Sequence, residues 1–344
     1  MRLARARQEM LAKPPGSLGL LETLSVQLAG ITGQVKNEIR KTRLYVFAAD
    51  NGVTAEGVAS APQSVTMAQS VNLTRGLTGA GSLCRHFGDE LIVVDMGIHD
   101  PYFCPAIVNR SLGKGTKNLA VEPAMTREQA VTALLTGFSF AEEARRDGVS
   151  VVGAGEMGIG NTTTSAAVLS CLTGLPVPVV TGRGGGITDA AFLHKKAVIE
   201  QALALHRPDP DDPIDVLTKV GGFDLCAMTG FYLGCAHEHL PVVIDGFIAI
   251  VAALCAVRLC KNAAGCLIAS HESFEPGYRK AAEELGLHPF LKLGMRLGEG
   301  SGCPLAFRML EAACAVMNTM ATFSEAAIND DYLTEIRAKD SFTV

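Results

Sequence analysis

The sequence predicts an α/β fold, in which a mainly parallel sheet is wound with helices on both faces. Short, continuous β-branched runs recur along the chain, and helix-compatible segments lie between them. Continuous apolar runs are typical of strands that are covered on both faces. The alternation of runs and helical segments favours parallel pairing, because a crossover helix returns the chain to the same end of the sheet.

Six runs are the expected strands: residues 43–49, 91–94, 149–152, 177–180, 241–244 and 266–269. The main helix-compatible segments between them are residues 67–87, 126–144, 163–172, 190–205 and 247–259. In sheets of this kind, ligands bind outside the carboxyl ends of the strands. The polar and glycine residues that directly follow each run are therefore the first candidates for a functional site.

Both ends of the chain are helix-patterned and contain no strand run. We therefore expect residues 1–32 and 304–344 to form a small helical domain, and residues 33–303 to form a large α/β domain. A length of 344 residues allows this division, since domains average roughly 150 residues.

The composition is that of an ordinary globular protein, with 48% hydrophobic and 19% charged residues. A net charge of −5 argues against a general nucleic-acid surface, which needs an excess of basic residues. The longest apolar stretch, residues 246–257, is too short to cross ~30 Å of hydrocarbon, so we expect no membrane span. The N-terminus has no secretory pattern and no C-x-x-C pair occurs, which favours a cytoplasmic protein with reduced thiols.

The most specific local pattern is GAGEMG at residues 153–158, directly after the third run. It matches the G-x-G-x-x-G fingerprint, so a nicotinamide-dependent oxidoreductase is one alternative. No acidic residue lies ~20 positions further on to hold a ribose hydroxyl, and Glu156 would lie beside the pyrophosphate. A single phosphate, held by amides at the start of a helix that opens with Asn161, fits the pattern better, and a tight turn that binds nothing is the simplest alternative.

A second glycine loop, Gly182–Gly186, follows the fourth run and leads into a helix that carries Lys195. Consecutive glycines expose backbone amides, and Arg183 and Lys195 supply positive charge. This loop is also suited to a phosphate or a ribose. A mobile surface loop without a ligand is the alternative.

Several carboxylates are candidates for a general base. Glu299 lies between glycines in the sequence RLGEGSG, where a ligand could approach the backbone closely. Glu156 and three aspartates that follow strand runs, Asp50, Asp95 and Asp245, compete with it for this role. An ordinary loop acid is the simpler interpretation of Glu299.

Seven motifs taken together resemble one family, nicotinate-nucleotide:dimethylbenzimidazole phosphoribosyltransferase, which acts in the assembly of the cobamide lower ligand. The resemblance covers the chain from Lys13 to about Ala327. The motifs are, in order, Lys13–Gly19, Ala49–Val53, Gly153–Thr163, Gly182–Gly184, Lys219–Asp224, Ile244–Phe247 and Arg296–Gly302.

The resemblance implies transfer of 5-phosphoribose from nicotinate mononucleotide to 5,6-dimethylbenzimidazole or a related lower-ligand base. The products would be α-ribazole 5′-phosphate and nicotinate. It also implies a homodimer with a Rossmann-like large domain, a small helical domain and no metal or cofactor. The active site would lie at the carboxyl ends of the strands, and the partner subunit would complete it.

The resemblance also assigns roles to residues. It implies that Glu299 is the general base and Glu156 a second catalytic carboxylate. The residues expected to bind the phosphoribosyl group are Gly158, Ile159, Gly160, Asn161, Thr162, Gly184, Gly185 and Lys195. The residues expected to bind the base are Pro62, Gln69, Met157 and Leu297.

The sequence departs from the family pattern beside the expected base site. Ala61 stands where relatives carry Ser or Tyr, so another benzimidazole, a purine or a phenol stays open as the acceptor. Asn51 stands where many relatives have His. A catalytically silent nucleotide-binding subunit of a paired complex is the remaining alternative.

Overall fold

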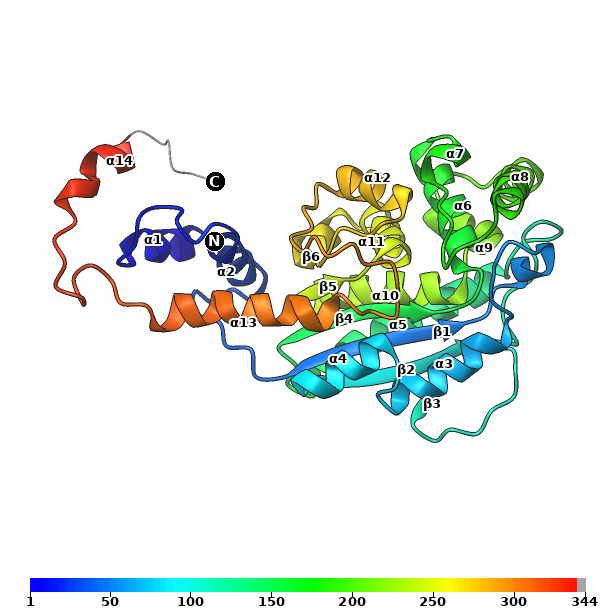
Figure 1. The fold of residues 1–344 in the computed structure, drawn as a ribbon, viewed down its shortest axis with the longest axis horizontal. Helices are drawn as coiled ribbons and strands as arrows, with labels where there is room; N and C mark the ends of the chain where they lie inside the picture. The colour runs from blue at the N-terminus through cyan, green and yellow to red at the C-terminus, as the bar shows by residue number, and fades with distance from the viewer. Residues whose placement is uncertain (339–344) are drawn as a thin grey trace. The chain divides into compact units, whose positions relative to one another are not determined.

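The computed structural model describes residues 1–338 and confirms the mainly parallel α/β fold. Six parallel strands form one sheet in the order β3-β2-β1-β4-β5-β6 (Figure 1). The direction of winding reverses between β1 and β4, and such a switch point is where doubly wound sheets bind ligands. The strands are β1 (Thr42–Ala49), β2 (Glu90–Gly97), β3 (Ile107–Asn109), β4 (Val151–Met157), β5 (Val242–Ile244) and β6 (Leu267–Ala269).

Five of the six expected runs coincide with strands, and the run at residues 177–180 does not. That run forms α7 (Val177–Val180), a single helical turn. Pro176 and Pro178 have no amide hydrogen to donate to a sheet ladder, but proline fits the first turn of a helix. The short strand β3 was not expected, because only Ile107 and Val108 in it are apolar and a polar residue, Asn109, ends it.

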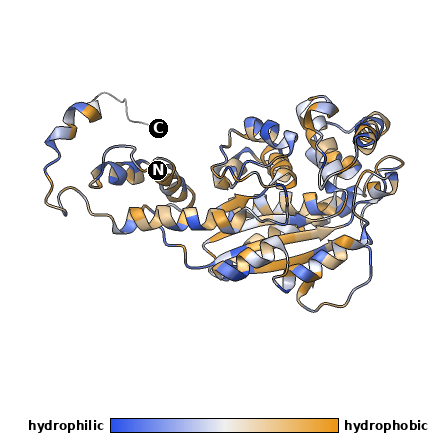
Figure 2. Cartoon of the chain, in the orientation of Figure 1, coloured by the Kyte–Doolittle hydropathy of each residue, from blue (hydrophilic) through white to orange (hydrophobic). Residues whose placement is uncertain are grey.

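Two helices cover one face of the sheet over β1. They are α5 (Arg127–Arg146) and α10 (Phe223–His237), which pack together above β1 in Figure 1. Tyr45 and Phe47 lie two residues apart on β1 and therefore point to the same face. Each contacts Phe140 of α5 and Phe231 of α10, with ring centroids 5.0 to 6.1 Å apart. These four buried rings form the centre of the core, and the strands around them are mostly hydrophobic (Figure 2).

The opposite face of the sheet is covered by the helical segment between β1 and β2 (Figure 1). The expected helical segment at residues 67–87 forms two helices, α3 (Ser64–Thr74) and α4 (Gly79–Phe87), because Gly76 adopts a left-handed φ of 68° between them. The remaining elements of this part of the chain are η1 (Gly52–Glu56), α6 (Asn161–Thr173), α8 (Asp189–His206), α9 (Pro213–Val220), α11 (Phe247–Leu259), η2 (Lys261–Cys266) and α12 (Pro276–Leu285). Within residues 1–338, no helix combines the length and the apolar character that a membrane crossing requires.

The chain divides into two compact units. The larger is Lys41–Ala306, and the smaller combines residues 1–40 with the residues from 307 onward. The smaller unit has its own apolar core, in which Ala4, Val26, Ala29 and Met317 are buried together. Its helices include α1 (Arg2–Met10), α2 (Leu20–Thr32), most of α13 (Cys303–Thr319), η3 (Asp331–Leu333) and α14 (Thr334–Ala338). The last six residues of the expected helical domain, 339–344, lie outside the described residues.

Glycines allow α5 and α10 to approach each other closely. A Cβ atom added at Gly230 of α10 would overlap the carbonyl oxygen of Leu134 on α5. A Cβ atom added at Gly137 of α5 would likewise overlap the carbonyl oxygen of Ala227 on α10. The backbones of the two helices are therefore in direct contact at these positions.

We expect Gly230→Ala to destabilise the protein by about 1–3 kcal/mol, which is the usual cost of overpacking a filled interior. Helix propensity alone would favour Ala by ~1 kcal/mol, so the sign of the change shows which effect dominates. Urea unfolding would measure it, with Gly265→Ala as the control, because an added Cβ at Gly265 meets nothing within 4 Å. A Gly230→Ala protein as stable as the wild type would contradict the close packing.

Candidate active site

A cleft of about 240 Å³ opens at the carboxyl edge of the sheet, within the larger unit. The end of β4, the start of α6, the second glycine loop and the loop that carries Glu299 all contribute to its lining. Twelve of the fourteen residues that the sequence predicts as site residues line this cleft. Lys195 and Pro62 are the two that do not.

Lys195 lies behind the lining of the cleft and is almost fully buried. Its Nζ atom donates hydrogen bonds to Thr162 Oγ1 at 2.8 Å and to the carbonyl oxygen of Gly182 at 3.1 Å. Burial lowers the pKa of Lys195 to about 8, although Glu275 opposes this shift. Lys195 therefore connects the start of α6 with the second glycine loop.

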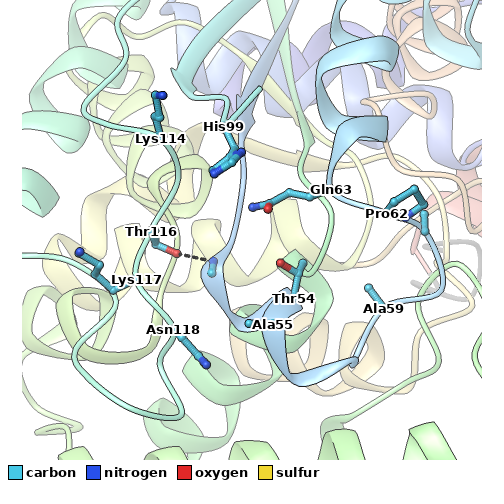
Figure 3. A pocket seen from close by; sticks show the side chains of 12 residues that line it. Thr54, Ala55, Ala59, Pro62, Gln63, His99, Lys114, Thr116, Lys117 and Asn118 are labelled. Carbon is cyan, nitrogen blue, oxygen red and sulfur yellow. Dashed lines mark hydrogen bonds between the residues drawn. The ribbon is translucent and has the colours of Figure 1, made fainter. Parts of the chain in front are cut away.

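Pro62 lines a neighbouring pocket of about 540 Å³, which Figure 3 shows from close by. Residues of η1, the segment before α3, His99 and the loop of residues 114–118 form this pocket. Ala59 and Ala61 line both the pocket and the cleft. The segment that contains these two alanines is therefore a shared wall between the two cavities.

Strand β4 extends further than the sequence predicts, because residues 153–157 continue it instead of forming a loop. A Cβ atom added at Gly155 would overlap the backbone of Gly300. Gly155 is thus needed for the close approach of the loop that carries Glu299. The dinucleotide fingerprint places its glycines in the turn after the strand, whereas Gly153 and Gly155 lie inside β4. The match to that fingerprint is therefore coincidental.

Glu299 lies at the centre of a left-handed turn. Gly298, Glu299 and Gly300 have φ values of 87°, 63° and 81°, a region that costs a non-glycine residue roughly 1–2 kcal/mol. Non-glycine residues held in such conformations cluster at functional sites. The turn is fixed by Asp245, which follows β5 and accepts hydrogen bonds from the amides of Gly300 at 3.1 Å and Gly302 at 2.7 Å.

The carboxylate of Glu299 is also fixed in place. Its Oε2 atom accepts a hydrogen bond from the amide of Ala80 at 3.1 Å, in the first turn of α4. Helix N-termini favour anionic groups, because their amides and dipole point toward them. Within residues 1–338, the structure records no hydrogen bond to the other carboxylate oxygen, Oε1, so this atom is available to a ligand in the cleft.

Glu156 forms a buried polar cluster with two other residues. The amide nitrogen Nδ2 of Asn161 donates to Glu156 Oε2 and, at 3.1 Å, to Asp224 Oδ2. Burial and the nearby Asp224 carboxylate raise the pKa of Glu156 to about 8, and burial raises the pKa of Asp224 to about 6. At neutral pH, Glu156 therefore holds a proton that it can donate.

The three aspartates that compete with Glu299 do not line the cleft. Asp95 accepts hydrogen bonds from the amides of Gly97 and Ile98, and Asp50 accepts one from the amide of His99, all at 2.8 Å. These two side chains therefore stabilise turns at strand ends, and Asp245 holds the turn that contains Glu299. Within the described part of the chain, no group of three or more His, Cys, Asp or Glu residues could hold a metal ion.

Sequence reasoning missed several residues that line the cleft, among them Glu275, Ser273 and Phe247. The acidic residues from 272 to 284 are interpreted from sequence as one solvated helical face, and this is wrong for Glu275. Its Oε1 atom accepts a hydrogen bond from the amide of Gly184 at 2.8 Å. Its position six residues after β6 is the only signal that could have indicated a place at the carboxyl edge of the sheet.

The fold and the cleft define a doubly wound α/β protein whose candidate active site lies at the switch point of its sheet. A family model described as "Phosphoribosyltransferase" matches residues 1–328, and the chain belongs to this family of enzymes. The resemblance that the seven motifs indicate is thereby confirmed, and the nicotinamide-dependent oxidoreductase is excluded.

Curated relatives and solved structures match nearly the whole chain. A relative from Clostridium perfringens, named nicotinate-nucleotide–dimethylbenzimidazole phosphoribosyltransferase, is 48% identical, and the match covers 99% of this chain and 94% of the relative. A relative of the same name from Geobacter sulfurreducens is 47% identical, with 96% and 95% covered. The crystal structure of CobT from Thermus thermophilus superposes with a TM-score of 0.92 at 40% identity, covering 96% of this chain and 98% of that one. This superposition confirms the fold class.

The raised pKa of Glu156 predicts how the stability of the protein depends on pH. The unfolded chain ionises this residue near its ordinary pKa of 4.5, whereas the folded protein keeps it protonated up to about pH 8. Its contribution to stability is therefore complete below pH 4.5 and is lost as the pH rises toward 8.

Glu156→Gln cannot ionise, and its side-chain oxygen can still accept the hydrogen bond from Asn161. We therefore expect its free energy of unfolding to fall less steeply than that of the wild type as the pH rises from about 5 to 8. Denaturant unfolding of both proteins at several pH values would measure this difference. Equal slopes would show that Glu156 is ionised in the folded protein.

Proposed function

We propose that this chain transfers the 5-phosphoribosyl group of nicotinate mononucleotide to 5,6-dimethylbenzimidazole or a related lower-ligand base. The products are α-ribazole 5′-phosphate and nicotinate, and the reaction serves the assembly of the cobamide nucleotide loop. The observation that carries this proposal is the fixed carboxylate of Glu299, which faces a cleft rich in backbone amides. The names of the full-length relatives support the choice of substrates.

The start of α6 is suited to the phosphate of the donor. Gly160 precedes this helix without a side chain to cap it, and the amides of Asn161 and Thr163 donate to the carbonyl oxygens of Gly158 and Gly160. Among the described residues, the amide of Thr162 has no recorded partner, so it is available to an anion. Gly184 and Gly185 of the second glycine loop line the same cleft. Lys195 fixes Thr162 between these two segments through its hydrogen bond to Thr162 Oγ1.

The reaction needs the acceptor base to be aligned with C1′ of the donor, and it needs one group that accepts a proton. A ring nitrogen of the base attacks C1′ with its lone pair, and the bond between C1′ and the pyridinium nitrogen breaks. The electron pair of that bond returns to the pyridine ring, which leaves as nicotinate, and attack from the opposite side gives the α linkage. We assign to Glu299 Oε1 the proton that the second ring nitrogen of the base loses.

Glu156 has an auxiliary role in this proposal. It is protonated at neutral pH, so it can donate a hydrogen bond to the substrate without adding a second negative charge beside Glu299. A Cβ atom added at Gly298 would lie 2.7 Å from Glu156 Oε1, so this oxygen lies next to the turn that carries Glu299. The two carboxyl groups are thus close together but chemically different.

The acceptor base is assigned to the part of the cleft that Gln69, Met157 and Leu297 line. Leu297 is 58% exposed, so an aromatic ring could cover its apolar surface. The small side chains of Ala59 and Ala61 leave room beside this part of the cleft. Incubation with nicotinate mononucleotide and a panel of azoles, purines and phenols, followed by mass spectrometry, would identify the preferred acceptor.

The homodimer that the resemblance implies and the cytoplasmic location that the cysteine pattern favours remain predictions. Sedimentation of the purified chain would test the first, since a dimer has twice the chain mass of 36.1 kDa. The domain boundaries at residues 32 and 303 also remain a prediction. The two compact units of the structure divide after residues 40 and 306.

We expect Glu299→Gln to lower kcat by roughly 10² to 10⁴, the usual contribution of a general base, because its amide cannot take up the proton. Binding of nicotinate mononucleotide, measured by calorimetry, should change little. Glu272→Gln is the matched control, since Glu272 forms an exposed ion pair with Arg279 at 2.9 Å. Unchanged turnover in Glu299→Gln would remove Glu299 from the mechanism, and a purified wild-type chain without activity would favour a silent subunit.

A further inference from the structure

One carboxylate in the cleft accepts a hydrogen bond from a backbone amide that could otherwise bind an anion. Glu275 precedes α12, and its Oε1 atom accepts a hydrogen bond from the amide of Gly184 at 2.8 Å. Its Oε2 atom is buried and has no hydrogen-bond partner among residues 1–338. A Cβ atom added at Gly182 would overlap this second oxygen. The carboxylate therefore lies directly against the second glycine loop.

The same loop is held from its other side by a positive charge. Lys195 Nζ donates a hydrogen bond to the carbonyl oxygen of Gly182. Gly184, whose amide donates to Glu275, follows two residues later. The positive charge of Lys195 lowers the pKa of Glu275, although burial raises it more. Residues 182–184 thus lie between a buried ammonium and a largely buried carboxylate of opposite charge.

The contact between Glu275 and Gly184 uses the chemistry of phosphate binding. A phosphate oxygen at a glycine loop also accepts hydrogen bonds from backbone amides. A nearby Lys supplies positive charge to a bound phosphate, as Lys195 does to Glu275 here. The second glycine loop is also the segment that we assign to the phosphate of the donor. A carboxylate and a phosphate cannot both accept the Gly184 hydrogen bond without mutual repulsion.

We propose that Glu275 is a positioning residue that occupies the phosphate-binding amides of the second glycine loop in the free enzyme and yields them to the 5′-phosphate of the donor. The carboxylate keeps the loop and Lys195 in place while no substrate is bound. Its negative charge makes the phosphate bind more weakly than the loop alone would allow. This inference rests on the proposed function, because it takes a phosphomonoester as the natural ligand.

The deciding variant is Glu275→Gln, which removes the charge but keeps an oxygen that can accept the Gly184 hydrogen bond. We expect the Kd of inorganic phosphate and the KM of nicotinate mononucleotide to fall at least about threefold, while kcat changes less than about twofold. The Kd of nicotinate riboside, which lacks the phosphate, should stay the same. A thermal melt would verify that the variant is folded.

Two further variants make the result specific. Glu275→Ala also frees the Gly184 amide, so we expect phosphate to bind it at least as tightly as it binds Glu275→Gln. Glu272→Gln is the matched control, because Glu272 lies three residues earlier in an exposed ion pair, and its constants should equal those of the wild type. If Glu275 is only a structural anchor, Glu275→Gln will match the wild type and Glu275→Ala will bind phosphate more weakly, and this result would overturn the proposal.

Phosphate binding and turnover separate this inference from the proposed function. Tighter phosphate binding by Glu275→Gln, in a chain that transfers no phosphoribose, would support the role of Glu275 and overturn the proposed reaction. Normal phosphoribosyl transfer by the wild type, with a phosphate Kd that is unchanged in Glu275→Gln, would support the proposed reaction and overturn the role of Glu275. Calorimetry with inorganic phosphate alone provides the binding measurement in both cases.

Discussion

The hydrogen bonds from the amides of Gly300 and Gly302 to Asp245 are the constraint on which the site depends. They attach a loop from late in the sequence to the end of a central strand. Gly155 allows this loop to lie directly on β4, and Ala80 fixes the carboxylate of Glu299. With each of these contacts in place, a strained turn becomes a rigid support for one carboxylate, and rigid placement is what general-base catalysis requires.

The cleft contains several acidic groups, although its proposed substrate is an anion. The structure separates them by environment. Glu275 faces Lys195, and Glu156 is protonated because burial disfavours its charge. Asp245 lies outside the lining of the cleft, where two backbone amides donate to it and His271 lies 3.7 Å away. The backbone amides at the start of α6 add partial positive charge opposite these groups. Arg183 and Arg296 also line the cleft, so its positive charge comes from two arginines and the backbone, with one buried lysine beside it.

The sequence predicted the fold class and most of the cleft, because apolar runs indicate strands and the carboxyl edge of a parallel sheet indicates the site. Prediction from the sequence failed where the position of a residue depends on a contact with a distant part of the chain. The end of β4 could not be placed, since Gly155 is explained by its contact with Gly300. Glu275 was missed because only the folded chain brings it to Gly184. The error at residues 177–180 was local, since the two prolines there already argued against a strand.

The wall that Ala59 and Ala61 form between the cleft and the neighbouring pocket separates two tasks within the chain. The two carboxyl groups and the amides assigned to the phosphate come from β4, α6, the second glycine loop and the loop of residues 298–302, whereas this wall belongs to the segment between η1 and α3. Substitutions at Ala59 and Ala61 change the room beside the proposed acceptor without replacing either carboxyl group, although Ser60 between them also lies near Gly185 of the second glycine loop. This short segment is therefore a place where the choice of acceptor base can change while Glu299 and Glu156 are kept.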